Sequence, residues 1–160
     1  MSRRAVCFAA LAAAIVGPAI AQQVPSLDAR AAEAIVRGCA THAAAKKQSH
    51  AVVVTDLGGD VVAALRMDGN GSGIFDFALA KARAAAAWGF STAQMLESAR
   101  GTPGFDRAPQ VVIVPGGVPL FSADGKSRLG AVGVSGEAPA DDAACADAGI
   151  RAAGLRTSRS

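Results

Sequence analysis

The fold is decided by residues 51–70, which read AVVVTDLGGDVVAALRMDGN. Two apolar runs, 51–54 and 61–65, flank a polar segment in which Gly58 and Gly59 supply the positive φ angles that a tight reversal needs. The pattern predicts a β-hairpin. Because neither run alternates apolar with polar residues, we expect helices to cover both faces of this hairpin.

Four chemically different residues follow the second strand, at the point where it becomes a loop: Arg66, Met67, Asp68 and Gly69. Binding groups often lie at such strand ends. Further along the chain, the turn Pro115-Gly116-Gly117 contains consecutive glycines whose backbone amides can approach a ligand. A plain turn explains the same residues.

Length and composition favour one small domain, and the N-terminus is typical of an export signal. The chain has 160 residues, of which 51% are hydrophobic and 4% aromatic, which suits a core rich in alanine and valine. Residues 1–21 are typical of a signal peptide, with Arg3 and Arg4 before a short apolar stretch and a small-x-small site ending at Ala21. We expect cleavage after Ala21, export to the periplasm or the exterior, one domain over 22–154 and a basic tail over 155–160.

Charge and cysteine content follow from that cleavage. Removing the signal takes away two arginines and no acid, so the formal net charge falls from +3 to +1. No basic patch interleaved with aromatic residues is present, so we expect neither nucleic-acid binding nor stable membrane insertion of the mature chain. The cleavage also removes Cys7 and leaves Cys39 and Cys145, which can form one disulfide in an oxidising compartment.

The rest of the sequence predicts four helices and three further strands. Ser26 is positioned to cap the first helix, and Ser91 opens a capping box for the third. The predicted helices are 27–47, 74–88, 91–99 and 139–153, and the predicted strands are 110–114, 118–122 and 128–134. This order is not a βαβ alternation, so we expect an α+β fold with a five-stranded antiparallel sheet between helical layers.

Two titratable residues fall on apolar helix faces. His42 is either a core histidine bonded to a carbonyl or a ligand to a metal or to haem iron. Lys81 lies in the middle of an apolar stripe, where it snorkels, pairs with Asp56 or Asp68, or serves a site. His50, just before the first strand, is expected in an exposed loop.

Successive blocks of the chain resemble the GlcG/HbpS-like family, and together they cover most of residues 27–153. The blocks are VVVTDLGGDVVAALRMDG (52–69), ALAKARAAA (78–86), VPGGVPLF (114–121), and RLGAVGVSG (128–136) followed by DDAACADAGI (141–150). The resemblance implies a profilin-like α/β/α fold, assembly into homo-oligomers, and first and last helices lying side by side. Cys39 and Cys145 would then face each other, which implies a disulfide between them.

The same resemblance implies a ligand cleft at the edge of the sheet, which a neighbouring subunit would help to form. Some family members bind or degrade haem, so haem is the expected cofactor, with His42 as the leading iron ligand. The residues implied in ligand binding are Asp56, Gly59, Arg66, Met67, Asp68, Gly69, Lys81, Gly116 and Gly117.

Three hypotheses for the function follow. The first is an exported protein that binds haem or a related tetrapyrrole, with iron bound by His42 or Met67 and the propionates paired with Arg66 and Lys81. The second is an enzyme acting on a small carbonyl or carboxylate compound, in which Lys81 and Asp68 transfer protons. The third is a non-catalytic oligomeric accessory protein of an exported oxidoreductase, which the low aromatic content favours.

Overall fold

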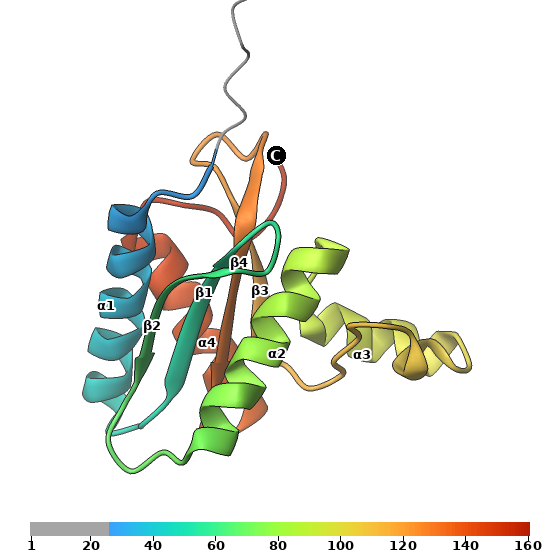
Figure 1. Ribbon diagram of the computed structural model, residues 1–160, viewed down its shortest axis with the longest axis horizontal. Coiled ribbons are helices and arrows are strands. Elements are labelled where there is room, and N and C mark those ends of the chain that lie inside the picture. The colour runs from blue at the N-terminus through green and yellow to red at the C-terminus, as the bar shows by residue number, and fades with distance from the viewer. Residues whose placement is uncertain (1–25) are drawn as a thin grey trace, which may run out of the picture.

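The computed structural model describes residues 26–160 (Figure 1). The predicted signal peptide and its cleavage site lie outside these residues. In chain order the elements are α1 (Ala29–Lys46), β1 (Ala51–Asp56), β2 (Val61–Arg66), α2 (Ser72–Trp88), α3 (Thr92–Gly101), the short 3-10 helix η1 (Phe105–Arg107), β3 (Gly117–Phe121), β4 (Arg128–Ser135) and α4 (Pro139–Ala152).

The four strands form one antiparallel sheet in the order β2-β1-β4-β3. This confirms an α+β fold, the predicted hairpin at 51–65 and the predicted strands at 118–122 and 128–134, but the predicted fifth strand at 110–114 is wrong, because these residues form an irregular segment. Pro109 and Pro115 bracket the segment and cannot donate backbone hydrogen bonds, and Gln110 has a φ of 58°. An apolar run alone therefore did not make a strand here.

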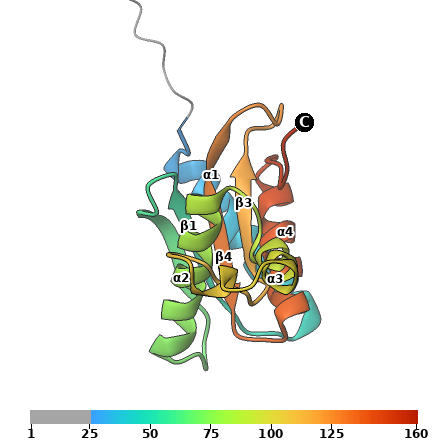
Figure 2. The same ribbon diagram turned by 90° about the vertical axis from the view of Figure 1, so that its right-hand side faces the viewer.

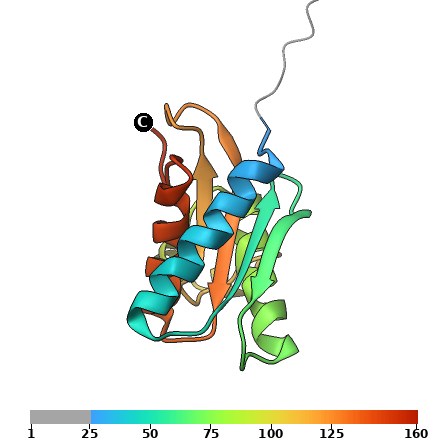
Figure 3. The same ribbon diagram turned by 90° about the vertical axis from the view of Figure 1, so that its left-hand side faces the viewer.

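Two helical layers cover the sheet. Figure 3 shows α1 and α4 beside each other on one face, and Figure 2 shows α2 in front of the opposite face. The two helices of the first layer approach closely where Gly38 meets Ala152 and Gly149, since a side chain at Gly38 would collide with both. The predicted disulfide joins the same helices: Cys39 and Cys145 are bonded, with Cα atoms 4.8 Å apart.

The main core lies between the sheet and the layer formed by α1 and α4. Every residue of β1 from Ala51 to Thr55 is buried, as expected for a strand covered on both faces. The expectation is wrong for β2, where Val61 and Leu65 are 48% and 37% exposed. The physical reason is position, because β2 is an edge strand and α2 packs over β1, β3 and β4.

Two predictions about the chain ends need correction. The first helix is capped by Asp28 rather than Ser26, since the Asp28 carboxylate accepts a hydrogen bond from the backbone N–H of Ala31 at 2.7 Å. The basic tail at 155–160, which the sequence predicts to be a frayed end, is instead paired, because Arg156 and Phe121 exchange two backbone hydrogen bonds of 2.8 and 3.1 Å.

The capping box at Ser91 is confirmed. Among the helices of residues 26–160, none has both the length and the apolar character needed to cross a bilayer.

Candidate functional site

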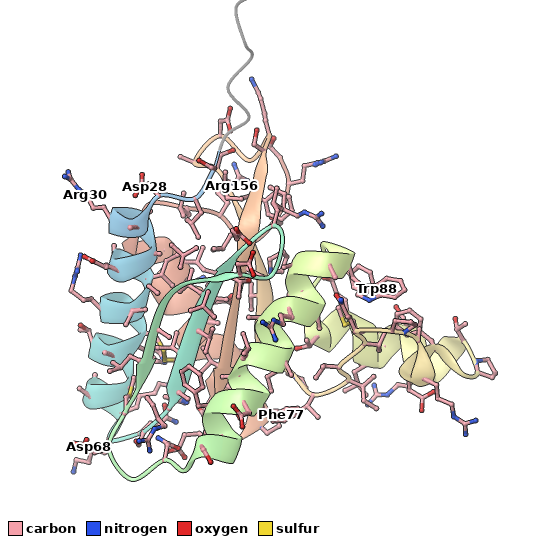
Figure 4. The ribbon with its side chains drawn as sticks, in the orientation of Figure 1. Asp28, Arg30, Asp68, Phe77, Trp88 and Arg156 are labelled. Atoms are coloured by element: carbon pink, nitrogen blue, oxygen red, sulfur yellow. A yellow bond between two sulfur atoms is a disulfide. The ribbon has the colours of Figure 1, made fainter. Side chains whose placement is uncertain are left out.

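Most of the predicted site residues gather at one end of the sheet, where β1 begins and where β2 and β4 end. We call this the lower end, after its place in Figure 1, and the opposite end the upper end. Asp68 lies at the lower end and Arg156 at the upper end (Figure 4). The pairing of Ala51 with Arg66 and with Ser135 fixes which residues meet at the lower end.

A buried ion pair is the main feature of the lower end. Lys81, in the middle of α2, is 1% exposed and donates to the Asp142 carboxylate and to the Val134 carbonyl, both at 2.9 Å. Its ammonium also lies 4.8 Å from the centre of the Phe77 ring. The acid partner of Lys81 is therefore Asp142 of α4, not Asp56 or Asp68.

His50 completes this cluster, and its predicted exposure is wrong because the residue is fully buried. Its Nδ1 lies 3.1 Å from the Asp142 carboxylate, which also accepts a hydrogen bond from the backbone N–H of Glu137. The Nε2 atom of His50 is buried without a hydrogen-bond partner. When Nδ1–H donates to Asp142, this Nε2 carries a free lone pair.

Met67 joins the cluster through two hydrogen bonds with the backbone of His50. Its N–H donates to the His50 carbonyl at 3.0 Å, and the His50 N–H donates to the Met67 sulfur at 3.4 Å. Arg66 and Asp68, on either side of Met67, are less buried. The Asp68 carbonyl accepts a hydrogen bond from the Ser49 hydroxyl, and the Arg66 guanidinium donates one to the Asn70 carbonyl. Both side chains are exposed.

The glycine turn packs directly against the ion pair. Gly116 has a φ of +126°, and a methyl group added there would lie 2.9 Å from Lys81 Nζ and 3.0 Å from the Asp142 Cβ. Gly117 donates its N–H to the Thr92 hydroxyl at 2.9 Å. Both glycines line a hollow of about 250 Å³.

The same hollow contains Asp147 of α4. Partial burial raises the pKa of its carboxyl above the usual range, and nearby Arg151 offsets part of this effect. The hollow therefore contains one carboxyl group with a raised pKa, that of Asp147, near the backbone atoms of Gly116 and Gly117.

Asp56 and Gly59 lie at the upper end, a full strand away from the other predicted residues. The Asp56 carboxylate accepts from the backbone N–H groups of Gly58 and Asp60 at 2.8 and 3.0 Å. It thus shapes the β1–β2 turn. The family resemblance groups Asp56 with Arg66 in one cleft, but the length of the hairpin separates them, since Arg66 pairs with Ala51 at its other end.

His42 lies in the seam between α1 and α4. It is spaced four residues from Gly38, which packs on Ala152, and four from Lys46, which pairs with Asp141 at 3.8 Å, so all three lie on one ridge of the helix. The residue is half-buried, and its Nε2 atom is buried without a hydrogen-bond partner. An imidazole nitrogen with a free lone pair is a donor suited to haem iron.

Sequence reasoning missed Asp142 and misplaced His50. Asp141 and Asp142 open the last helix, where acids are explained by the helix dipole. The spacing along the helix could have indicated that Asp142 is buried, because it shares a face with Cys145, Ala146 and Gly149, which are all buried. Within residues 26–160, no three His, Cys, Asp or Glu side chains gather closely enough to hold a metal ion.

Comparisons with known proteins agree with this fold. A family model described as haem degrading protein HbpS-like matches residues 27–151. A solved double mutant of HbpS from Streptomyces reticuli is 28% identical, with a TM-score of 0.72 over 86% of this chain and 95% of that chain. No curated protein matches the chain with significant similarity.

Two further solved structures share the fold at lower identity. A complex of PduOC with haem is 23% identical, with a TM-score of 0.76 over 84% of this chain and 100% of that chain. The protein ORFY of Klebsiella pneumoniae is also 23% identical, with a TM-score of 0.75 over 85% of this chain and 96% of that chain. Because the family model spans residues 27–151, this chain belongs to the HbpS-like family.

Proposed function

We propose that this protein binds haem or a related tetrapyrrole non-covalently, at the lower end of the sheet. The observation that carries the proposal is the buried, unpaired Nε2 of His42. Membership of the HbpS-like family supports it, and so does the shared fold with a protein solved in complex with haem.

The donor chemistry of two histidines fits haem iron, and their environments rank them. His50 is fully buried and its Nδ1 is held by Asp142, so its ring cannot reach a ligand without breaking the cluster. His42 is half-buried and its ring has no such bond to an acid, so its Nε2 can be turned toward a ligand without breaking a hydrogen bond. His42 is therefore the proposed iron ligand, and Met67, whose sulfur accepts a backbone N–H, is the second candidate.

The charged residues divide into a structural group and a ligand-binding group. The ammonium of Lys81 already has a carboxylate and a carbonyl as partners, so we assign the propionates to exposed Arg66. Asp68, Gly116 and Gly117 lie at the same end and are proposed to contact the ligand.

Haem chemistry would follow from its iron. The chain's own residues would hold the macrocycle, bind the iron through an imidazole and pair with the propionates.

We also propose that the protein is an exported homo-oligomer. A disulfide between helices suits an oxidising compartment, and the exposed Val61 and Leu65 on an edge strand suit burial against a second subunit. His42 does not line the hollow at Gly116 and Gly117, so a neighbouring subunit would form part of the haem site.

The enzyme hypothesis has less support. It paired Lys81 with Asp68 for proton transfer, but Lys81 pairs with Asp142 and the Asp68 side chain is exposed. A lysine held in a buried ion pair is poorly placed to exchange protons with a substrate. The accessory-protein hypothesis predicts no haem binding, so the same experiment tests it.

The test is an optical titration of haem into the purified protein, its His42→Ala variant and a Thr41→Ala control. Thr41 precedes His42 on α1 but is exposed, so its loss should leave the site intact. The proposal predicts a saturable Soret shift near one haem per subunit that weakens only in His42→Ala. Weak, non-saturating binding that is equal in all three proteins would refute it.

A further inference from the structure

An open hollow of about 650 Å³ lies at the upper end of the sheet, away from the proposed haem site. Four segments far apart in the sequence meet there: the β1–β2 turn, the end of α2, the β3–β4 hairpin and the C-terminal tail (Figure 1). The lining residues are Leu57, Trp88, Gly89, Phe121, Arg128 and Arg159. We propose that this hollow binds a small organic carboxylate with a compact apolar body.

Two cationic groups without acidic partners supply the anion preference. Among residues 26–160, no carboxylate lies within 4.0 Å of the guanidinium of Arg128 or Arg159. Two nearby acids are occupied within their own turns, since Asp124 accepts from Ser122 and the Lys126 N–H while Asp56 accepts from the β1–β2 turn. A guanidinium binds a carboxylate through two parallel hydrogen bonds, and both arginines line the same hollow, so both are expected to contribute to binding one carboxylate.

Apolar walls restrict the rest of the ligand. Leu57 and Trp88 are 40% and 38% exposed, and both line the hollow with apolar atoms. The indole N–H of Trp88 donates to the Pro109 carbonyl at 3.1 Å and the ring packs edge-to-face against Phe90 and Phe105, so Trp88 is fixed in place at the edge of the hollow. Phe121 is nearly buried and adds to the wall. Inorganic phosphate has no apolar part and would leave these apolar side chains in contact with water, whereas a carboxylate with an apolar body would cover them.

The site is held in place before any ligand arrives. Arg159 lies between two attachments of the tail to the β3–β4 hairpin, the paired Arg156 and the Ser160 N–H, which donates to the Gly125 carbonyl at 3.3 Å. At Gly89, a side chain would collide with the Arg128 guanidinium, so glycine leaves the space that Arg128 occupies. The backbone of the tail is therefore in place before binding, and only the exposed Arg159 side chain has to be ordered by the ligand.

The chain offers a built-in reporter for this hollow, because Trp88 is its only tryptophan. Cyclohexanecarboxylate is the probe, since it has a compact apolar body and does not absorb where tryptophan emits. Titrating it into the protein should shift the Trp88 emission in a saturable way. The matched neutral compound, cyclohexanecarboxamide, should bind at least about tenfold more weakly, because it lacks the charge that the arginines pair with.

Variants locate the binding. Arg159→Ala and Arg128→Gln should each weaken cyclohexanecarboxylate about tenfold, while Lys126→Ala, an exposed cation on the same hairpin outside the lining, should leave it unchanged. Arg159 is exposed, so its variant keeps the test valid even where Arg128→Gln disturbs folding, which circular dichroism would show.

Three results would overturn the proposal: no saturable shift, equal affinity in Arg159→Ala, or inorganic phosphate binding as tightly as cyclohexanecarboxylate. No haem is present in the experiment, and His42→Ala should not alter the binding. Failure of this proposal and failure of the haem proposal are therefore distinguishable.

Discussion

Lys81 and Asp142 form an ion pair with an N–O distance of 2.9 Å, and their side chains are 1% and 2% exposed. The pair joins α2 on one face of the sheet to α4 on the other, around the end of β4. Removing two charges from water is costly, and only close geometry with further hydrogen bonds repays that cost. The Val134 carbonyl, the Glu137 N–H and His50 supply those bonds.

Removing one member of this pair should therefore be severely destabilising. Lys81→Met should lower the free energy of unfolding by about 3 kcal/mol or more, because Asp142 keeps a buried charge without its cation. Urea denaturation followed by circular dichroism measures the change. Lys46→Ala is the control, since its 3.8 Å pair with Asp141 is half-exposed and should be worth less than about 1 kcal/mol. Equal losses in the two variants would contradict the assigned role.

The disulfide should stabilise mainly by restricting the unfolded chain. Cys39 and Cys145 are separated by 106 residues, which corresponds to about 4–5 kcal/mol in the chain-entropy model. We expect Cys39→Ala with Cys145→Ala to lower the melting temperature, and a reducing agent to do the same to the wild-type protein. The protein from an oxidising compartment should show no free thiol at either position by mass spectrometry under non-reducing conditions. Two free thiols would refute the disulfide.

Glycine at position 133 is expected to be irreplaceable. A methyl group there would collide with the Ala78 carbonyl and the Ala82 backbone nitrogen of α2, so Gly133→Ala should cost about 1–3 kcal/mol or more through forced separation of helix and strand. Gly73→Ala is the matched comparison, because open space surrounds that position in the first turn of α2. It should be neutral or stabilising by up to about 1 kcal/mol. A neutral Gly133→Ala variant would mean that α2 does not pack on β4 as closely as described.

Asp147 should make stability depend on pH in a defined direction. Burial raises the pKa of its carboxyl in the folded state, so ionisation at neutral pH opposes folding, and this cost disappears as the pH falls through the ordinary aspartate value of about 4. Asp147→Asn should therefore stabilise the protein at pH 7, by roughly half a kcal/mol or less because solvent screens a half-exposed group. Below about pH 4 the two proteins should be equally stable. Denaturation curves at both pH values decide, and a destabilised variant at pH 7 would mean that the carboxylate has a favourable partner.

Local patterns in the sequence predicted most of the fold. The hairpin at 51–66 and the capping box at Ser91 depend on neighbouring residues, so they could be read directly. The segment 110–114 was misassigned because its apolar pattern does not show the backbone: Pro109 and Pro115 lack the N–H groups that a strand donates, and Gln110 has a left-handed conformation that interrupts a strand.

The candidate site was harder to predict because its partners are distant in the sequence. Lys81 was recognisable as unusual on an apolar stripe, but Asp142 lies 61 residues away, and only the packing of α2 and α4 on opposite faces of the sheet, around the end of β4, brings the two together. His50 precedes a strand, where exposure is common, and only the same packing buries it. The cysteine pair was an exception, since the resemblance to a known family implied that their helices are adjacent.

The most direct test of the haem proposal is rescue of the His42→Ala variant by free imidazole. The variant should bind haem weakly and lack the spectrum of a histidine-ligated haem, because the Nε2 that bonds the iron is gone. Adding imidazole should restore that spectrum in the variant while leaving the wild-type complex unchanged. If His42→Ala binds haem with the wild-type spectrum in the absence of imidazole, His42 is not the iron ligand, and the site must be sought elsewhere in the protein.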